Sequence, residues 1–93
     1  PLSQLQPADI AQAMRVGLEA PMLLTAAFLA ATEGWTAVPR KVLNISSGLG
    51  RSAMAAQAPY CAAKAGMDHF TRCSALDEAH REHGARLVSL APA

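Results

Sequence analysis

Charged and aromatic side chains are scarce in this sequence, and charges of one sign do not cluster. Only 16% of the 93 residues are charged and 4% are aromatic, whereas 52% are hydrophobic. Eight basic and seven acidic residues are scattered along the chain, so we expect no nucleic-acid partner. A free-standing domain of this length normally has a larger polar surface. The composition therefore fits the interior of a larger α/β protein, and we expect the chain to be a fragment.

Long apolar runs and cysteines are also scarce. The apolar stretch 20–31 is shorter than the roughly 18 residues of a membrane span and lacks the basic start of a signal peptide. The two cysteines, Cys61 and Cys73, fall in one expected helix, about 18 Å apart and beyond disulfide reach. We therefore expect a reduced, cytoplasmic protein with no membrane partner.

Hydrophobic spacing and turn residues predict two helices and two strands. The expected order is a helix over 7–32, a strand over 41–46, a loop over 47–59, a helix over 60–83 and a strand over 86–90. The first strand has no clean alternation, which is typical of a central parallel strand covered on both faces. This order predicts a doubly wound parallel α/β fold of Rossmann type, with residues 1–93 forming part of one domain.

Three residues are expected to shape the helices. Pro7 suits the first position of a helix because its missing N–H would have no partner there. Pro21 lies inside the first helix and should kink or split it. Gly84 is expected to end the second helix in the left-handed conformation.

A tyrosine, a lysine and a serine are the candidates for chemistry. Tyr60 and Lys64 are four residues apart, so both leave one face of the expected helix one turn apart. The lysine charge favours the phenolate and lowers the pKa of the tyrosine, which can then exchange a proton with a carbonyl or alcohol oxygen. Ser47 follows the first strand at the sheet edge where such folds bind ligands, and its hydroxyl can hold an oxygen on which charge develops.

Joined at this spacing, these segments resemble the classical short-chain dehydrogenases/reductases over essentially the whole chain. The matching residues are Val42-Leu43-Asn44-Ile45-Ser46-Ser47, Tyr60-Cys61-Ala62-Ala63-Lys64-Ala65-Gly66 and Leu87-Val88-Ser89-Leu90-Ala91-Pro92. The segment 16–22 looks most like members related to sepiapterin and benzil reductases, which use NADPH. The resemblance therefore implies an NAD(P)-dependent oxidoreductase acting on a carbonyl or alcohol, with NADP(H) favoured over NAD(H).

The resemblance also implies a role for each candidate residue. Ser47, Tyr60 and Lys64 would be catalytic: Ser47 would hold the substrate oxygen, Tyr60 would be the general acid/base, and Lys64 would bind the nicotinamide ribose. Ile45 and Pro92 would join Tyr60 and Lys64 in binding the cofactor. Gly48 and Leu49 would line the substrate side with Ser47 and Tyr60. The two long helices would form a homodimer or homotetramer, as the family commonly does.

This chain departs from the family pattern in three places. Gly17 stands where the family usually has an asparagine that helps hold a proton relay to the lysine. The segment Gly48-Leu49-Gly50 has the wrong spacing and position for a phosphate-binding loop. Ala93 replaces the glycine that usually follows Pro92. The phosphate-binding part of the family is therefore expected outside these residues.

Other polar residues have simpler interpretations. We expect no metal site, because His69, His80 and His83 lack further ligands and the last two suit the end of a helix. A solvated helix face with local ion pairs is expected for Asp77, Glu78, Arg81 and Glu82. Two alternatives to a classical reductase remain: an epimerase or dehydratase of the extended branch of the superfamily, and a non-catalytic interaction or oligomerisation module.

Overall fold

The computed structural model describes residues 2–45 and 58–90 of the chain. Its elements are a short 3₁₀ turn at Leu2–Gln4, α1 (Pro7–Met14), a π-helical turn η2 (Arg15–Glu19), α2 (Ala20–Ala31), β1 (Lys41–Ile45), α3 (Ala58–Ala79) and β2 (Arg86–Leu90). The predicted order of helix, strand, helix and strand is therefore confirmed. Most of the expected loop 47–59, and Ser46 at the end of the expected strand, lie outside the described residues.

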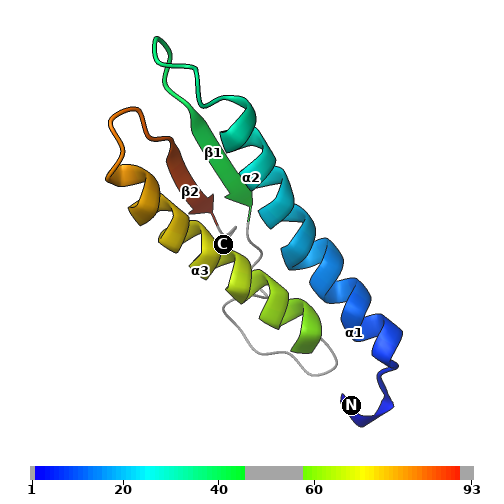
Figure 1. Cartoon of the computed structure of the whole chain (residues 1–93). Helices are drawn as coiled ribbons and strands as arrows, with labels where there is room; N and C mark the ends of the chain where they lie inside the picture. Colours follow the sequence, from blue (N-terminus) through cyan, green and yellow to red (C-terminus); the bar gives the residue numbers. More distant parts are fainter. Residues whose placement is uncertain (1, 46–57, 91–93) are drawn as a thin grey trace.

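The two strands form a parallel sheet of which the helices cover one face (Figure 1). Lys41 pairs with Arg86, and the register continues to Ile45 with Leu90. Leu87 is buried on the covered face, whereas Leu43 and Ile45, which point the other way, are 52% and 58% exposed. The expectation that β1 is covered on both faces is wrong for this chain, since α2 and α3 lie on the same side.

The first long helix is continuous from Pro7 to Ala31, one residue shorter than predicted. Its first turn is closed by Asp9, whose Oδ2 accepts a hydrogen bond from the Gln6 N–H at 3.2 Å. Pro21 does not end the helix. Instead, η2 lies directly before it, and the Ala20 N–H bonds to the Arg15 carbonyl in the wider π pattern. A π turn accommodates the proline where an α-helix would force its ring against the Gly17 carbonyl.

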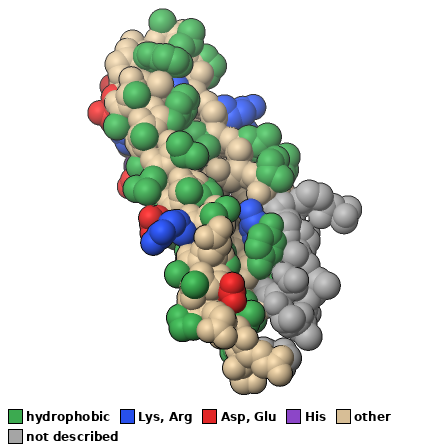
Figure 2. All heavy atoms as spheres, turned by 90° about the vertical axis from the view of Figure 1, so that its right-hand side faces the viewer, with side chains coloured by type: hydrophobic (Ala, Val, Ile, Leu, Met, Phe, Trp, Pro, Cys, Tyr) green, Lys and Arg blue, Asp and Glu red, His purple; other side chains and the backbone are tan. Residues whose placement is uncertain are grey.

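This helix presents many of its apolar side chains to the outside (Figure 2). Val16, Leu23 and Leu24 are 63%, 62% and 72% exposed. By length and composition alone the helix could cross a membrane, a weak indication because a core helix of a soluble protein passes the same test. The sequence-based expectation considered only the shorter stretch 20–31. The continuous helix is longer because η2 carries it past Pro21.

The end of α3 differs from the prediction. The helix ends at Ala79 rather than at His83, so His80 and His83 lie in the turn beyond it and not on its last turn. Gly84 does not have the left-handed backbone that was predicted. It is needed for space, because a Cβ at this position would lie 1.8 Å from the Glu78 carbonyl oxygen.

A polar cluster with a buried centre joins the ends of α2 and α3 to the starts of both strands. We call it the Arg40 cluster; its members are Thr32, Glu33, Arg40, Glu78 and Arg81. The Arg40 guanidinium donates to the carbonyls of Leu29 and His83 and to the hydroxyl of Thr32. It lies 3.7 Å from the Glu78 carboxylate, and both side chains are almost fully buried.

Glu78 also contradicts the expectation of a solvated face. Its Oε1 accepts the Ala85 N–H at 3.0 Å, and its Oε2 accepts from Arg81 at 3.0 Å. The Ala85 N–H holds the pKa of Glu78 below its ordinary value of 4.5; burial opposes this shift, and Arg81 and Arg40 add to it. The local pair with Arg81 was expected, but the buried position of Glu78 was not.

Candidate functional site

Tyr60 and Lys64 lie one turn apart at the start of α3, on one face, as their spacing predicted. The Lys64 Nζ is 5.5 Å from the centroid of the Tyr60 ring. Tyr60 is 38% exposed, whereas Lys64 is half-buried. Among residues 2–45 and 58–90, the ion pairs all belong to the Arg40 cluster, so none of them uses the charge of Lys64.

The pair lies at the end of the molecule toward which both strands point (Figure 1). The carboxyl ends of parallel strands are where open α/β sheets bind their ligands. Tyr60 is also in the first turn of a 22-residue helix, whose positive end favours a negative charge. The pair therefore lies in the first turns of a long helix, near the carboxyl ends of the two strands.

The other predicted site residues are only partly placed. Ile45 is the last residue of β1 and is 58% exposed on the open face of the sheet. Ser47, Gly48, Leu49 and Pro92 lie outside the described residues. The structure therefore brings together Tyr60 and Lys64 and leaves the remaining assignments as predictions.

Two polar contacts fix α3 against the strands behind the site. The Asn44 amide in β1 donates to the Thr71 hydroxyl at 3.0 Å, and Thr71 donates to the Met67 carbonyl at 2.9 Å. The hydroxyl of Ser89 in β2 donates to the Asp68 carboxylate. Both contacts are on the covered face of the sheet, so they set how deep α3 lies against β1 and β2.

Sequence reasoning missed these four polar residues. Thr71 is the most buried large side chain described, with 1% exposure, and Ala63 and Met67 lie on the same face of α3. A signal was present, because Thr71 continues their spacing of four residues, which marks the buried stripe of a helix. The same stripe reaches Glu78, which could therefore have been recognised as buried.

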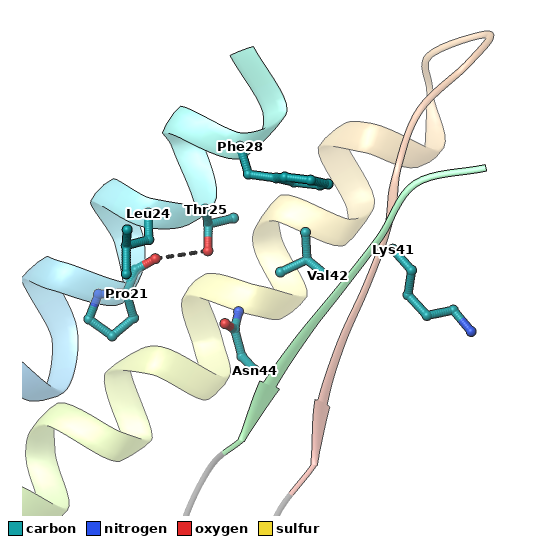
Figure 3. A pocket seen from close by; sticks show the side chains of 7 residues that line it. All are labelled: Pro21, Leu24, Thr25, Phe28, Lys41, Val42 and Asn44. Carbon is teal, nitrogen blue, oxygen red and sulfur yellow. Dashed lines mark hydrogen bonds between the residues drawn. The ribbon is translucent and has the colours of Figure 1, made fainter. Parts of the chain in front are cut away.

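A separate apolar hollow of about 310 Å³ lies between α2 and β1 (Figure 3). Phe28 and Val42 line it, and the Thr25 hydroxyl beside it donates to the Pro21 carbonyl at 2.8 Å. Lys41 extends away from the helices in this view. Neither Tyr60 nor Lys64 lines the hollow, so its position does not support a role in the chemistry of that pair.

No group of three or more possible metal ligands occurs within residues 2–45 and 58–90. In this part of the chain, the Cys73 sulfur lies 3.7 Å from the His69 Nε2 on the exposed face of α3. His80 and His83 are exposed. The histidines therefore form no metal site among the described residues.

The fold and the site together define a class: a Rossmann-type α/β protein with a tyrosine–lysine pair at the carboxyl end of its parallel strands. The family described as short chain dehydrogenase matches residues 1–93 of the sequence. The chain therefore belongs to the short-chain dehydrogenase/reductase family.

Relatives and a solved structure agree with this placement. The benzil reductase ((S)-benzoin forming) of Bacillus cereus is 35% identical over 92 residues, which are 99% of this chain and 36% of that protein. The protein of the same description from Bacillus subtilis (strain 168) is 30% identical over 84% of this chain and 32% of its own length. A short-chain dehydrogenase/reductase from Burkholderia vietnamiensis superposes with a TM-score of 0.83 at 38% identity, covering 99% of this chain and 40% of that one. The chain thus spans about a third of the length of the curated relatives that it matches.

Proposed function

We propose that this chain supplies the catalytic segment of an NAD(P)(H)-dependent enzyme that interconverts a carbonyl and a secondary alcohol. The observation that carries the proposal is the Tyr60–Lys64 pair, with the lysine 5.5 Å from the tyrosine ring at the ligand-binding end of the sheet. In the epimerase or dehydratase alternative the same pair would serve another reaction. The compact serine-to-tyrosine spacing and the benzil reductase relatives favour the reductase.

The side chains would act on the substrate oxygen. In the reductive direction, the Tyr60 hydroxyl gives its proton to the oxygen as the carbonyl carbon gains the hydride, and the alcohol forms. Lys64 stabilises the phenolate that remains, and Ser47 is assigned to hold the oxygen while it carries negative charge. A proton from solvent restores the Tyr60 hydroxyl before the next turnover. In the oxidative direction the phenolate removes the proton from the alcohol.

The described residues fit one end of a nicotinamide cofactor. The half-buried Lys64 ammonium beside an exposed phenol offers donors for the hydroxyls of the nicotinamide ribose, and Ile45 and Pro92 are assigned to the same pocket. When bound, the nicotinamide supplies or accepts the hydride. Gly48 and Leu49 are assigned to the substrate side. We favour NADP(H) over NAD(H), and we assign residues 1–93 to a single cofactor-binding domain.

The partner is proposed to be a small carbonyl or alcohol compound, and an aromatic diketone such as benzil is the first to test because the relatives carry that name. We further propose a cytoplasmic enzyme that assembles as a homodimer or homotetramer through its two long helices. The exposed apolar side chains Val16, Leu23 and Leu24 on the first helix support such an assembly.

The decisive experiment follows NADPH oxidation by the protein that carries this chain, with benzil and a simple ketone as substrates. Tyr60→Phe removes only the hydroxyl and is expected to lower kcat by a factor of about 100 to 10,000. Lys64→Met tests whether activity requires the positive charge of Lys64. Lys41→Met is the matched control, because Lys41 is an exposed lysine on β1. Full activity in Tyr60→Phe would refute the proposed mechanism.

A second candidate is a non-catalytic module that acts through its helices. The apolar exposure of the first helix is the observation that favours it. Cofactor binding distinguishes the two candidate functions. Protection of the protein against thermal unfolding by NADPH supports the enzyme, and its absence together with helix-dependent self-association supports the module.

A further inference from the structure

Gly17 lies in the π-helical turn η2, where the first helix packs closely against α3. Gly17 is buried, and Ala63, its neighbour across the contact, has no exposed surface. A Cβ added to Gly17 would lie 2.9 Å from the Ala63 Cβ, closer than such atoms pack. The two helices also approach closely at Gly66 of α3, where an added Cβ would lie 3.3 Å from a methyl carbon of Leu18.

This contact falls beside the candidate catalytic pair. Ala63 precedes Lys64 in α3 and is three residues after Tyr60, so it belongs to the turn that carries both. Among the described residues, α3 makes its polar contacts with the strands further along, at Asp68 and Thr71, and Glu78 binds Ala85 directly before β2. A side chain added at Gly17 would displace Ala63 and therefore tilt the first turns of α3, while the later turns of α3 stay fixed to the sheet.

We propose that Gly17 is a positioning residue, whose missing side chain lets η2 hold the Tyr60–Lys64 turn of α3 at its working distance from the sheet. The inference rests on the proposed function of Tyr60, because positioning matters only if that side chain reacts. Gly17 would then have a structural role of its own, although it stands where the family usually has an asparagine. Restoring an asparagine there would force the two helices apart, so Gly17→Asn should lower activity.

The test compares Gly17→Ala with Gly34→Ala in the purified protein. Gly34 is an exposed glycine, and a Cβ added there would meet nothing within 4 Å. Gly34→Ala therefore controls for the effect of replacing a glycine with alanine where no neighbour is displaced. Gly17→Ala is expected to lower kcat about ten- to a hundredfold while KM for NADPH and ketone changes little, because the groups are displaced but still bind. Gly34→Ala is expected to keep the parent kcat.

A size swap shows whether the contact is the cause. Gly17→Ala combined with Ala63→Gly moves the methyl group across the interface and leaves the sum of helix propensities unchanged. The swap should recover most of kcat, and Gly17→Asn should also recover part of its loss when combined with Ala63→Gly. If Gly17→Ala does not fold, the swap decides: parent-like kcat supports the inference, and a folded swap with low kcat overturns it.

A spectroscopic measurement keeps this inference separate from the proposed function. The chain has one tyrosine, so the ring-current shift that NMR detects on the Lys64 ε-methylene reports the Tyr60–Lys64 geometry without any turnover. We expect this shift to change in Gly17→Ala, to return in the swap and to stay constant in Gly34→Ala. Unchanged shifts and parent kcat in Gly17→Ala, with Tyr60→Phe inactive, would overturn the inference and leave the proposed function standing. Full activity in Tyr60→Phe would overturn the proposed function and, with it, the catalytic part of the inference.

Discussion

Replacing Glu78 with glutamine removes one negative charge from the Arg40 cluster and nearly preserves the shape of the side chain. Oε1 can still accept the Ala85 N–H, but the Arg40 guanidinium, 3.7 Å away and almost fully buried, loses its counter-charge. Loss of one partner of a fully buried pair costs about 3–5 kcal/mol, and a single charged hydrogen bond contributes about 1.5–3 kcal/mol. Because Arg40 keeps the Leu29, Thr32 and His83 oxygens as acceptors, we expect a loss of about 2–3 kcal/mol in the free energy of unfolding.

Urea unfolding followed by the fluorescence of Trp35, the single tryptophan, measures this loss. Glu33→Gln is the matched control, since Glu33 pairs with the same Arg81 at the surface, where side-chain exposures are 45% and 57%. Exposed pairs of this kind contribute about 0–1 kcal/mol. Equal stabilities of the Glu78→Gln and Glu33→Gln proteins would refute the reasoning.

The same carboxylate predicts how stability depends on pH. The pKa of Glu78 is lowered on folding, mainly by the Ala85 N–H, so its contribution is present above the unfolded value of 4.5 and is lost as pH falls through the lower folded value. Urea midpoints of the parent should therefore decline more steeply below pH 4.5 than those of Glu78→Gln. Parallel curves for the two proteins would contradict this assignment.

Two further substitutions test the backbone and the polar contacts behind the site. Gly84→Ala places a Cβ 1.8 Å from a backbone carbonyl of α3, so we expect a loss of more than about 3 kcal/mol or no folded protein, as judged by thermal melts against Gly34→Ala. Thr71→Val removes the acceptor of the Asn44 amide and should lower the free energy of unfolding in urea by about 1–3 kcal/mol. The control Thr36→Val, on the exposed loop, should change it by no more than about 0.5 kcal/mol. Equal urea midpoints for the two variants would show that the contact does not contribute to stability.

Local patterns were sufficient to predict the order of elements and the common face of Tyr60 and Lys64. Both follow from periodicity, which depends on neighbours along the chain. The parallel pairing of β1 with β2 also followed, since a helix between two strands favours it. The family resemblance added the reaction class, which spacing alone left open.

The features that were missed depend on contacts between distant segments. α3 ends at Ala79 because the Glu78 side chain accepts the Ala85 N–H and Arg40 donates to the His83 carbonyl. Neither hydrogen bond can be predicted from the local sequence. The π turn before Pro21 was not foreseen either, since Pro21 alone fits a kink, a split or a wider turn. The open face of β1 differs from the expectation because α2 and α3, the described helices that pack on the sheet, lie on the same side of it.

The Arg40 cluster also has a consequence for the order in which the sheet opens. The Arg86 N–H bonds to the Arg40 carbonyl at 3.0 Å, directly before the first pair of the ladder, Lys41 with Arg86. This end is clamped by buried charge, whereas the last pair, Ile45 with Leu90, has both side chains more than half exposed. We therefore expect amide hydrogen exchange to speed up along β2 from Arg86 toward Leu90, as fraying begins at the unclamped end. The ladder would then loosen first at the end of the sheet where the candidate Tyr60–Lys64 pair lies, so the strand ends there could adjust to a ligand without loss of the fold.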